Sequence, residues 1–263
     1  MNVFITGASS GIGAALASAY ASQYKNEELN IGLASRRSEH LQNLKVLLET
    51  QPNIRCHSYP LDVRDHQALA IAAGDFIMHA GAPDVVIACA GVSRGTLTEH
   101  QEDIAAFQAV MDINVMGMVH TFQPFITAMR EAGGGQLVGI ASVAGIRGLP
   151  GAGAYSASKA AAISYLESLR VEMAPSNIAV TTIAPGYIRT PMTDVNTYSM
   201  PFLMDADIAA QKFIKAIAGK RRFVVIPWQM GWLGRIMKFI PPVIWDWAMK
   251  KAPYKPRLDW DWL

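Results

Sequence analysis

Short apolar runs alternate along the chain with longer segments in which apolar residues recur every three or four positions. The short runs predict strands over residues 3–6, 30–34, 55–60, 84–88, 135–140, 178–183 and 223–226. The longer segments predict helices over residues 11–25, 38–50, 66–79, 101–132, 155–174 and 205–219. Strands that are apolar throughout are typical of a parallel sheet covered by helices on both faces. We therefore expect an α/β fold with a doubly wound parallel sheet in three layers.

The chain after residue 226 follows a different pattern. Residues 228–240 predict an apolar helix that carries Arg235 and Lys238, and a second apolar helix is predicted over 243–251 after two prolines. We expect a single domain over residues 1–226, with a substrate loop at 190–205, and an amphipathic or apolar extension over 227–263. No stretch reaches the roughly 18 uncharged apolar residues that a membrane-spanning helix needs.

Charge is unevenly distributed along the chain. The net charge is +2, but from Lys220 onward nine basic and three acidic side chains give +6, against −4 for the rest. Tryptophan beside Lys and Arg on an apolar helix suits peripheral contact with a membrane. The same composition suits the interface of a homodimer or homotetramer, or a lid over the substrate pocket. We expect no nucleic-acid partner.

The cysteines and histidines bear on disulfide bonds, the cellular compartment and metal binding. Cys56 and Cys89 make no disulfide framework, so we expect reduced thiols in a cytoplasmic protein, with Cys89 inside a buried strand. Because the chain opens on a predicted strand, we expect no signal peptide. The six histidines show no spacing that builds a metal site, so no metal is expected.

A glycine-rich turn follows the first predicted strand. The segment from Thr6 to Gly13 reads TGASSGIG and opens the first predicted helix. Glycines at such a turn allow the backbone to approach a pyrophosphate, and the helix N-terminus presents free N–H groups to the anion. The turn predicts a Rossmann-type dinucleotide site at Gly7, Ser9, Ser10, Gly11, Ile12 and Gly13.

The end of the second predicted strand bears on the choice of dinucleotide. An NAD site places an acidic residue there to bind the ribose 2′-hydroxyl, whereas this chain has Arg36 and Arg37. A guanidinium binds a 2′-phosphate through two parallel hydrogen bonds. We expect NADP to be preferred, with NAD as the alternative.

A tyrosine and a lysine four residues apart begin a later predicted helix. Tyr155 and Lys159 then share one helix face, and the ammonium is expected to lower the pKa of the phenol, which is ordinarily ~10. Ser142, at the end of the preceding strand, can donate a hydrogen bond to a carbonyl oxygen. This is the chemistry that a carbonyl group needs when it accepts a hydride, because its oxygen must gain a proton.

These motifs, in this order, resemble the short-chain dehydrogenase/reductase family over residues 2–226. The resemblance implies that Asp62 and Val63 contact the adenine, and that Asn114 joins Ser142, Tyr155 and Lys159 in a catalytic tetrad. It also implies that Ala90, Gly91, Pro185, Gly186, Ile188 and Thr190 contact the cofactor, with Ile188 binding the carboxamide. The family's NNAG segment is Ala88-Cys89-Ala90-Gly91 here, so we expect altered packing but retained chemistry.

The sequence therefore predicts an NADP-preferring oxidoreductase acting on a carbonyl or secondary alcohol. Met192, Tyr198, Met200, Phe202 and Met204 in the substrate loop suit an apolar or lipid-like substrate, although the same residues suit core packing. Two alternatives remain at this stage. One is a non-catalytic nicotinamide sensor, and the other is a membrane-docking protein on the same fold. The pattern does not choose the substrate.

Overall fold

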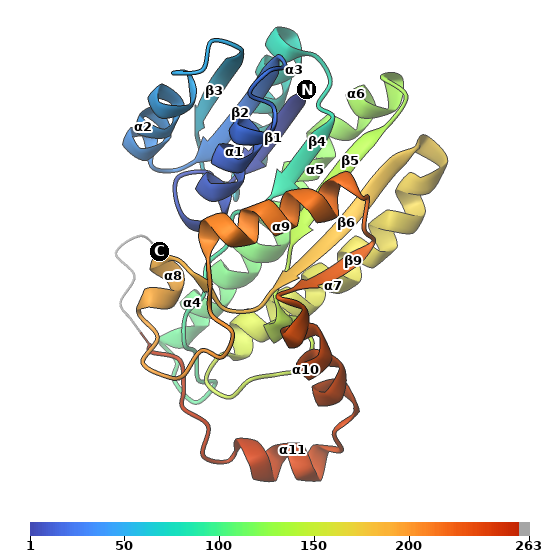
Figure 1. Ribbon diagram of the computed structural model, residues 1–263. Helices are drawn as coiled ribbons and strands as arrows, with labels where there is room; N and C mark the ends of the chain where they lie inside the picture. The colour runs from blue at the N-terminus through green and yellow to red at the C-terminus, as the bar shows by residue number, and fades with distance from the viewer. Residues whose placement is uncertain (258–263) are drawn as a thin grey trace.

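The computed structural model describes residues 1–257 and places a parallel sheet at the centre of the molecule (Figure 1). Within these residues the sheet has seven strands in the order β3-β2-β1-β4-β5-β6-β9. Their bounds are β1 Asn2–Thr6, β2 Leu29–Ser35, β3 Ile54–Pro60, β4 Val85–Ala88, β5 Gly135–Ile140, β6 Ile178–Pro185 and β9 Phe223–Ile226. The order reverses between β1 and β4, which makes the sheet doubly wound, as expected.

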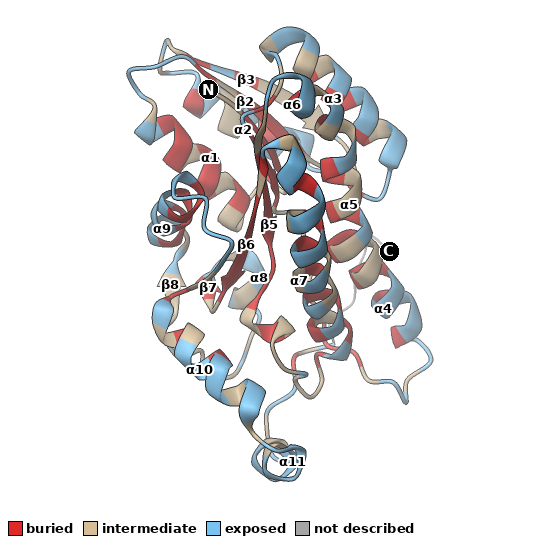
Figure 2. Cartoon of the chain, turned by 90° about the vertical axis from the view of Figure 1, so that its right-hand side faces the viewer, coloured by how far each residue is buried: buried red, intermediate tan, exposed pale blue. Residues whose placement is uncertain are grey.

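Helices cover both faces of this sheet, and Figure 2 shows the three layers edge-on. The helices α1 and α9 pack together on one face, and α3, α5 and α7 lie on the other. The helix bounds are α1 Gly11–Gln23, α2 Ser38–Leu48, α3 His66–Ala80, α4 Asp103–Met111, α5 Gly117–Phe122, α6 Ile126–Glu131, α7 Gly153–Met173, α8 Pro191–Asp194 and α9 Ala206–Ala218. Each face has its own apolar core, because the strands are buried on both sides.

The long helix expected over residues 101–132 is wrong as a single element. The helix α4 passes into a π-helical turn over Asp112–Met116, then α5, a 3-10 turn at Gln123–Phe125, and α6. Pro124 explains the second break, because proline removes a helical N–H donor. The chain also forms elements that the pattern did not predict, among them the helix α8 and two short paired strands, β7 Ile188–Arg189 and β8 Met204–Asp205.

Two helices follow the last strand, close to the expected positions. They are α10 Trp228–Phe239 and α11 Pro242–Met249, and they lie beyond the carboxyl ends of the strands (Figure 1). An extended segment, residues 252–257, then returns along the body of the protein. The final six residues of the expected extension, 258–263, lie outside the described part of the chain. Among residues 1–257, no helix combines the length and the apolarity needed to cross a bilayer.

Candidate active site

A cleft of about 490 Å³ opens at the carboxyl ends of the central strands. Ligands of doubly wound sheets bind at this edge, near the point where the strand order reverses. Nearly every residue expected from the sequence reaches this cleft. The expected residues that line it are Gly7, Ser9, Ser10, Gly11, Ile12, Gly13, Arg36, Arg37, Asp62, Val63, Ala90, Gly91, Ser142, Tyr155, Lys159, Pro185, Gly186, Ile188 and Thr190.

The turn between β1 and α1 is built so that only glycine fits at its key positions. Gly7 has a φ of +72°, and a Cβ there would lie 2.8 Å from the Ala90 backbone. A Cβ on Gly13 would lie 2.2 Å from the Gly7 carbonyl oxygen. The Thr6 hydroxyl accepts hydrogen bonds from the backbone N–H groups of Cys89 and Ala90, at 3.3 and 3.4 Å. The close backbone packing leaves a cradle that fits a diphosphate.

The end of β2 contributes two polar groups to the rim of this cradle. The Arg37 guanidinium donates from Nη2 to the Ser9 and Ser10 hydroxyls, and from Nε to Ser9 at 3.2 Å. Within residues 1–257, the buried Ser35 hydroxyl oxygen has no hydrogen-bond partner although it lines the cleft. An orphaned hydroxyl beside a guanidinium fits the ribose and phosphate end of a dinucleotide.

Sequence reasoning missed Ser35. Its position was a usable signal, because a hydroxyl at the carboxyl end of β2 points to the same edge as the glycine turn. Arg36 and Arg37, which follow it, suggested a contact with the 2′-phosphate through charge alone.

Asp62 and Val63 line the cleft just after β3, beside the end of β2, where the Leu61 N–H donates to the Ser35 carbonyl oxygen at 3.0 Å. The Asp62 carboxylate accepts hydrogen bonds from the Arg64 backbone and guanidinium, with Nη2 at 2.8 Å. Burial opposes ionisation of Asp62, but these hydrogen bonds prevail and hold its pKa below the usual value. The Val63 carbonyl oxygen lies 3.1 Å from His120 Nδ1. Both residues are thereby held at the cleft.

Tyr155 lies in the first turn of α7, with the Ser142 side chain close to its phenol. Burial raises the pKa of Tyr155, the Ser142 hydrogen bond lowers it, and the nearby Tyr187 phenol raises it again. The net shift is upward. The sequence expectation of a pKa lowered by Lys159 is therefore wrong for this arrangement, because burial outweighs every other influence on the phenol.

Lys159 follows one turn later on the same helix, as the four-residue spacing predicts. Its Nζ donates to the Ile140 carbonyl oxygen at 2.8 Å and lies 5.9 Å from the centroid of the Tyr155 ring. Burial lowers the pKa of Lys159 to about 8. The ammonium is thus fixed at the carboxyl end of β5, facing the phenol.

Asn114 lies behind the cleft wall, inside the π-helical turn, and is 1% exposed. Its amide accepts from the Val92 N–H at 2.8 Å and donates to the Val92 carbonyl at 2.9 Å. The same amide nitrogen donates to the Ser158 hydroxyl at 2.9 Å. The side chain therefore ties the segment after β4 to α7, next to Lys159.

Cys89 does not lie inside a strand, contrary to expectation. It follows the last residue of β4, is half-buried and lines the cleft. Burial raises the pKa of its thiol to about 12. A thiol held protonated is a poor nucleophile, so Cys89 is not placed to act as one.

Two tyrosines border the substrate side. Tyr187 and Tyr198 make an edge-to-face contact with ring centroids 6.4 Å apart. Burial, followed by the Tyr187 and Tyr155 phenols, raises the pKa of Tyr198 to about 12. Residues 190–205 thus bring the Tyr198 phenol close to Tyr155.

Thr190 caps α8 in a reciprocal arrangement with Thr193, whose hydroxyl also donates to the Ile188 carbonyl.

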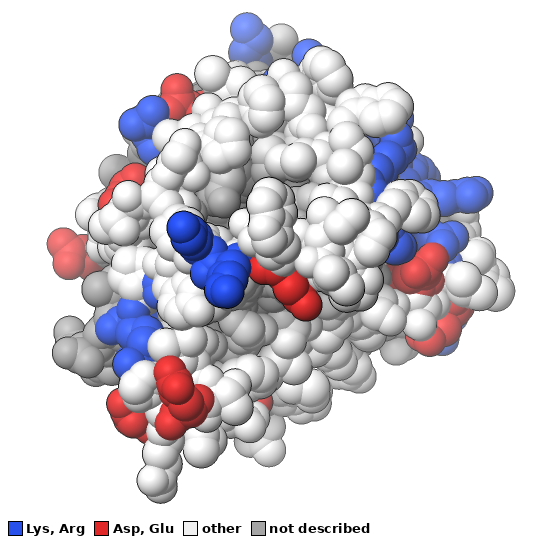
Figure 3. Space-filling model, turned by 90° about the horizontal axis from the view of Figure 1, so that it is seen from below, with Lys and Arg blue, Asp and Glu red and all other residues white. Residues whose placement is uncertain are grey.

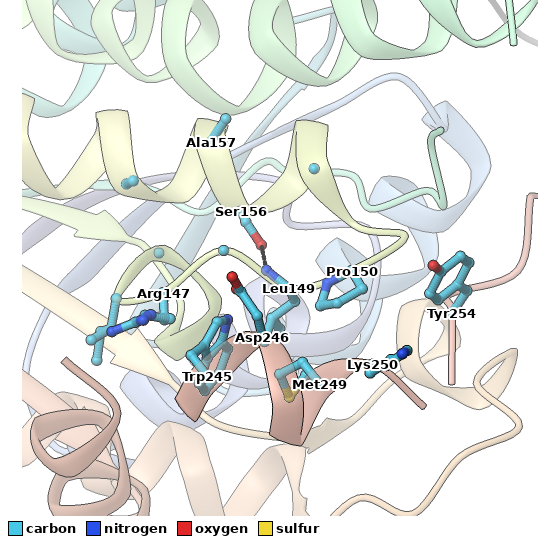
Figure 4. Close-up of a pocket in the computed structure, with 15 residues that line it drawn as sticks. Arg147, Leu149, Pro150, Ser156, Ala157, Trp245, Asp246, Met249, Lys250 and Tyr254 are labelled. Atoms are coloured by element: carbon cyan, nitrogen blue, oxygen red, sulfur yellow. Dashed lines mark hydrogen bonds between the residues drawn. The ribbon is translucent and has the colours of Figure 1, made fainter. Parts of the chain in front are cut away.

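A second cavity, of about 700 Å³, lies between residues 145–150, the start of α7 and α11 (Figure 4). Trp245 and Met249 of α11 reach into it. Among residues 1–257, no group of three or more His, Cys, Asp or Glu side chains is arranged to hold a metal ion.

Comparison with known proteins identifies the family. The short chain dehydrogenase family model matches residues 1–199. An uncharacterized oxidoreductase of Myxococcus xanthus (strain DK1622) is 34% identical over 247 residues, covering 94% of this chain and 95% of the relative. The chain belongs to the short-chain dehydrogenase family and is an NAD(P)-dependent oxidoreductase acting on a CH–OH/C=O pair.

Two solved structures share the fold. A 7α-hydroxysteroid dehydrogenase complexed with NADH and 7-oxo glycochenodeoxycholic acid has a TM-score of 0.77 at 21% identity, covering 86% of this chain and 92% of its own. L-sorbose reductase from Gluconobacter frateurii, complexed with NADPH and L-sorbose, has a TM-score of 0.76 at 22% identity, covering 86% and 94%. At these identities the likeness concerns the fold alone.

Proposed function

We propose that this protein is an NADP-preferring reductase of a carbonyl group, with Tyr155, Ser142 and Lys159 as its catalytic residues. The observation that carries the proposal is the cleft itself. It joins the glycine cradle, with Arg37 at its rim, to Ser142, Tyr155 and Lys159, which line the same cleft. When bound, the nicotinamide dinucleotide supplies or accepts the hydride.

The raised pKa of Tyr155 suits the direction of reduction. A phenol that stays protonated at neutral pH can donate its proton to the oxygen of a carbonyl that is being reduced. The Ser142 hydroxyl holds the same oxygen by a second hydrogen bond. The Lys159 ammonium favours the phenolate that remains, because opposite charges attract strongly in a buried site. Asn114 acts as a positioning residue, since its amide braces the backbone beside Lys159.

The cofactor residues divide into three groups in this proposal. The turn over residues 7–13 holds the diphosphate through backbone N–H groups. Ser35, Arg36 and Arg37 hold the 2′-phosphate, and Asp62 and Val63 form the adenine wall. Residues 90–91 and 185–190 border the nicotinamide end. NADH and NADPH both occur in proteins of this fold, so the preference rests on the arginines of this chain.

The substrate class follows from the loop that faces Tyr155. Met192 of this loop lines the cleft, and Tyr198 of the same loop contacts Tyr187, so this side presents aromatic and thioether surface. We assign an apolar or lipid-like carbonyl compound to this side, because such surface offers little to solvate a charged group.

The cofactor preference is tested by Arg37→Ala. A hydrogen bond from a guanidinium to a phosphate contributes about 1.5–3 kcal/mol, so the Kd for NADPH is expected to rise about 10- to 100-fold. The Kd for NADH should change less than about twofold. Fluorescence titration measures both constants. Equal losses of affinity for the two dinucleotides would contradict a 2′-phosphate contact.

The reaction class is tested by measuring the oxidation of NADPH in the presence of ketones, aldehydes and 3-oxoacyl compounds.

A further inference from the structure

The helices α10 and α11 present large apolar side chains to solvent. On α10, Trp232, Ile236 and Phe239 follow helical spacing, and Phe239 is 83% exposed. On α11, Val243 is 80% and Trp247 is 79% exposed, while Trp245 and Met249 face the cavity beneath the helix. Apart from Asp246, the side chains of α11 are apolar both toward the cavity and toward solvent, and apolar surface of this kind is normally covered. The outward face of α11 therefore calls for a covering partner.

The body of the protein holds this apolar face in place. Arg147, in the segment after β5, donates from Nη1 to the Met237 and Ile240 carbonyl oxygens at 2.9 and 2.8 Å. Its guanidinium also lies 4.8 Å from the Trp245 ring centroid. One side chain thus fixes the turn between the two helices, and Gly234 allows α10 to lie directly on Ile146. The apolar side chains form a fixed platform.

Basic residues accompany the apolar ones on these two helices. Arg235 and Lys238 lie on α10, Lys250 and Lys251 follow α11, and all four are exposed, against the single acidic residue Asp246 over 228–251. Figure 3 shows this end of the molecule as a broad, largely uncharged surface, with Lys and Arg side chains near its middle and at its edges and a smaller number of Asp and Glu side chains beside them. Apolar and aromatic side chains with flanking cations match the boundary between anionic headgroups and acyl chains.

We propose that the surface formed by α10 and α11, residues 228–251, docks on a lipid bilayer that contains anionic headgroups. The helices have 12 and 8 residues, about 18 and 12 Å long, which suits helices lying in the plane of the interface. A second copy of the chain fits this surface less well. A two-fold contact would bring the four basic residues toward the same four on the partner.

Docking here would place the cleft next to the membrane. The platform lies at the carboxyl end of the sheet, the same end as Tyr155 and the substrate loop (Figure 1). An apolar carbonyl compound dissolved in the bilayer would then reach the site over a short path. This consequence rests on the proposed function, whereas the docking itself does not.

Vesicle flotation of the full chain tests the proposal. Vesicles of phosphatidylcholine with an equal share of phosphatidylglycerol should bind the protein, and phosphatidylcholine alone should bind less. The variant Val243→Ser/Phe239→Ser/Trp247→Ser should lower the bound fraction at least about fivefold, because the buried apolar area is lost. The matched control is Ile71→Ser/Met78→Ser on α3, which alters two side chains that are 74% and 79% exposed. It should bind as the parent does.

Circular dichroism and thermal unfolding confirm that each variant is folded, and light scattering gives the oligomeric state without vesicles. The proposal is overturned if the folded parent fails to float with anionic vesicles, or if both variants float equally. It is also overturned if the triple variant changes the oligomeric state while vesicle binding stays constant. That result would assign the surface to a second copy of the chain.

Discussion

Tyr155 and Lys159 share one face of α7, and burial acts on both by disfavouring the charged form. The phenol is held neutral because burial raises its pKa, and the ammonium titrates at about 8 because burial lowers its pKa. Lys159 is therefore still charged at neutral pH, and burying this charge lowers the free energy of unfolding of the folded protein. Functional sites commonly hold such strained protonation states at the expense of stability.

Replacing Lys159 should stabilise the fold while removing its chemistry. The shift from 10.5 to about 8 is equivalent to roughly 3 kcal/mol at neutral pH, and the lost hydrogen bond to Ile140 offsets about 1. We expect Lys159→Met to raise the free energy of unfolding by about 2 kcal/mol at pH 7. Urea denaturation measures this difference.

The difference in the free energy of unfolding between Lys159→Met and the parent should depend on pH in one direction. Between pH 8 and 10.5 the unfolded chain binds more protons at Lys159 than the folded chain, so the parent gains stability as pH rises. The advantage of the variant should therefore be largest below pH 8 and shrink toward pH 10.5. A variant less stable than the parent at pH 7 would show that the ammonium carries no burial cost.

The positions of the catalytic residues could be read from the sequence, but their energetics could not. The four-residue spacing of Tyr155 and Lys159, and the strand-end position of Ser142, follow from helix and sheet geometry. Burial depends on what other elements place around these groups, and the Tyr187 and Tyr198 phenols come from a distant loop. Local spacing cannot supply that information, so the direction of the Tyr155 pKa shift was missed.

At the scale of elements, the extended segment 252–257 links the tail to the substrate loop. The buried Lys255 donates to the Asn196 side chain at 3.1 Å, and burial lowers its pKa to about 8. Arg257 bonds the buried Asp103 carboxylate on α4, with Nε at 2.8 Å from Oδ2. The Gly95 N–H donates to the Pro256 carbonyl. The segment therefore ties α4 and the substrate loop together.

Loosening this segment should free the substrate loop. We expect Lys255→Met/Arg257→Gln to raise KM for the carbonyl substrate several-fold and to speed proteolysis within residues 195–203, because the loop loses an ordering contact. The Kd for NADPH should stay constant, since the cradle lies elsewhere. Lys212→Met/Lys215→Gln on α9 removes the same charge from exposed positions and serves as the control. An unchanged cleavage rate would show that the loop is held by other contacts.

Element types were predictable where periodicity is strong. All seven strands of the main sheet in residues 1–257 match predicted runs, because buried parallel strands are apolar throughout. The breaks within 101–132 were not, since an apolar pattern continues across a π-helical turn. The π-helical turn contains Asn114, whose side chain bonds Val92 and Ser158 far away in the sequence.

At the scale of the whole molecule, the cleft and the surface formed by α10 and α11 lie at one end. The carboxyl ends of the strands form the cleft, and α10 and α11 follow directly from β9 at the same edge (Figure 1). Parallel topology makes the position of the cleft predictable, because the carboxyl ends of all strands meet at one edge. The contact of residues 252–257 with α4 was not predictable, because no local pattern encodes the bond between Arg257 and Asp103.

The proton donated by Tyr155 is the central claim, and single-turnover oxidation of bound NADPH tests it most directly. The experiment compares Tyr155→Phe with the parent on a carbonyl compound that the parent reduces. The Kd for NADPH should stay within about threefold, because the cradle is unaltered, while the rate of NADPH oxidation falls about 10²- to 10⁴-fold. A variant that keeps its cofactor affinity and oxidises NADPH within about tenfold of the parent rate would contradict the assigned role.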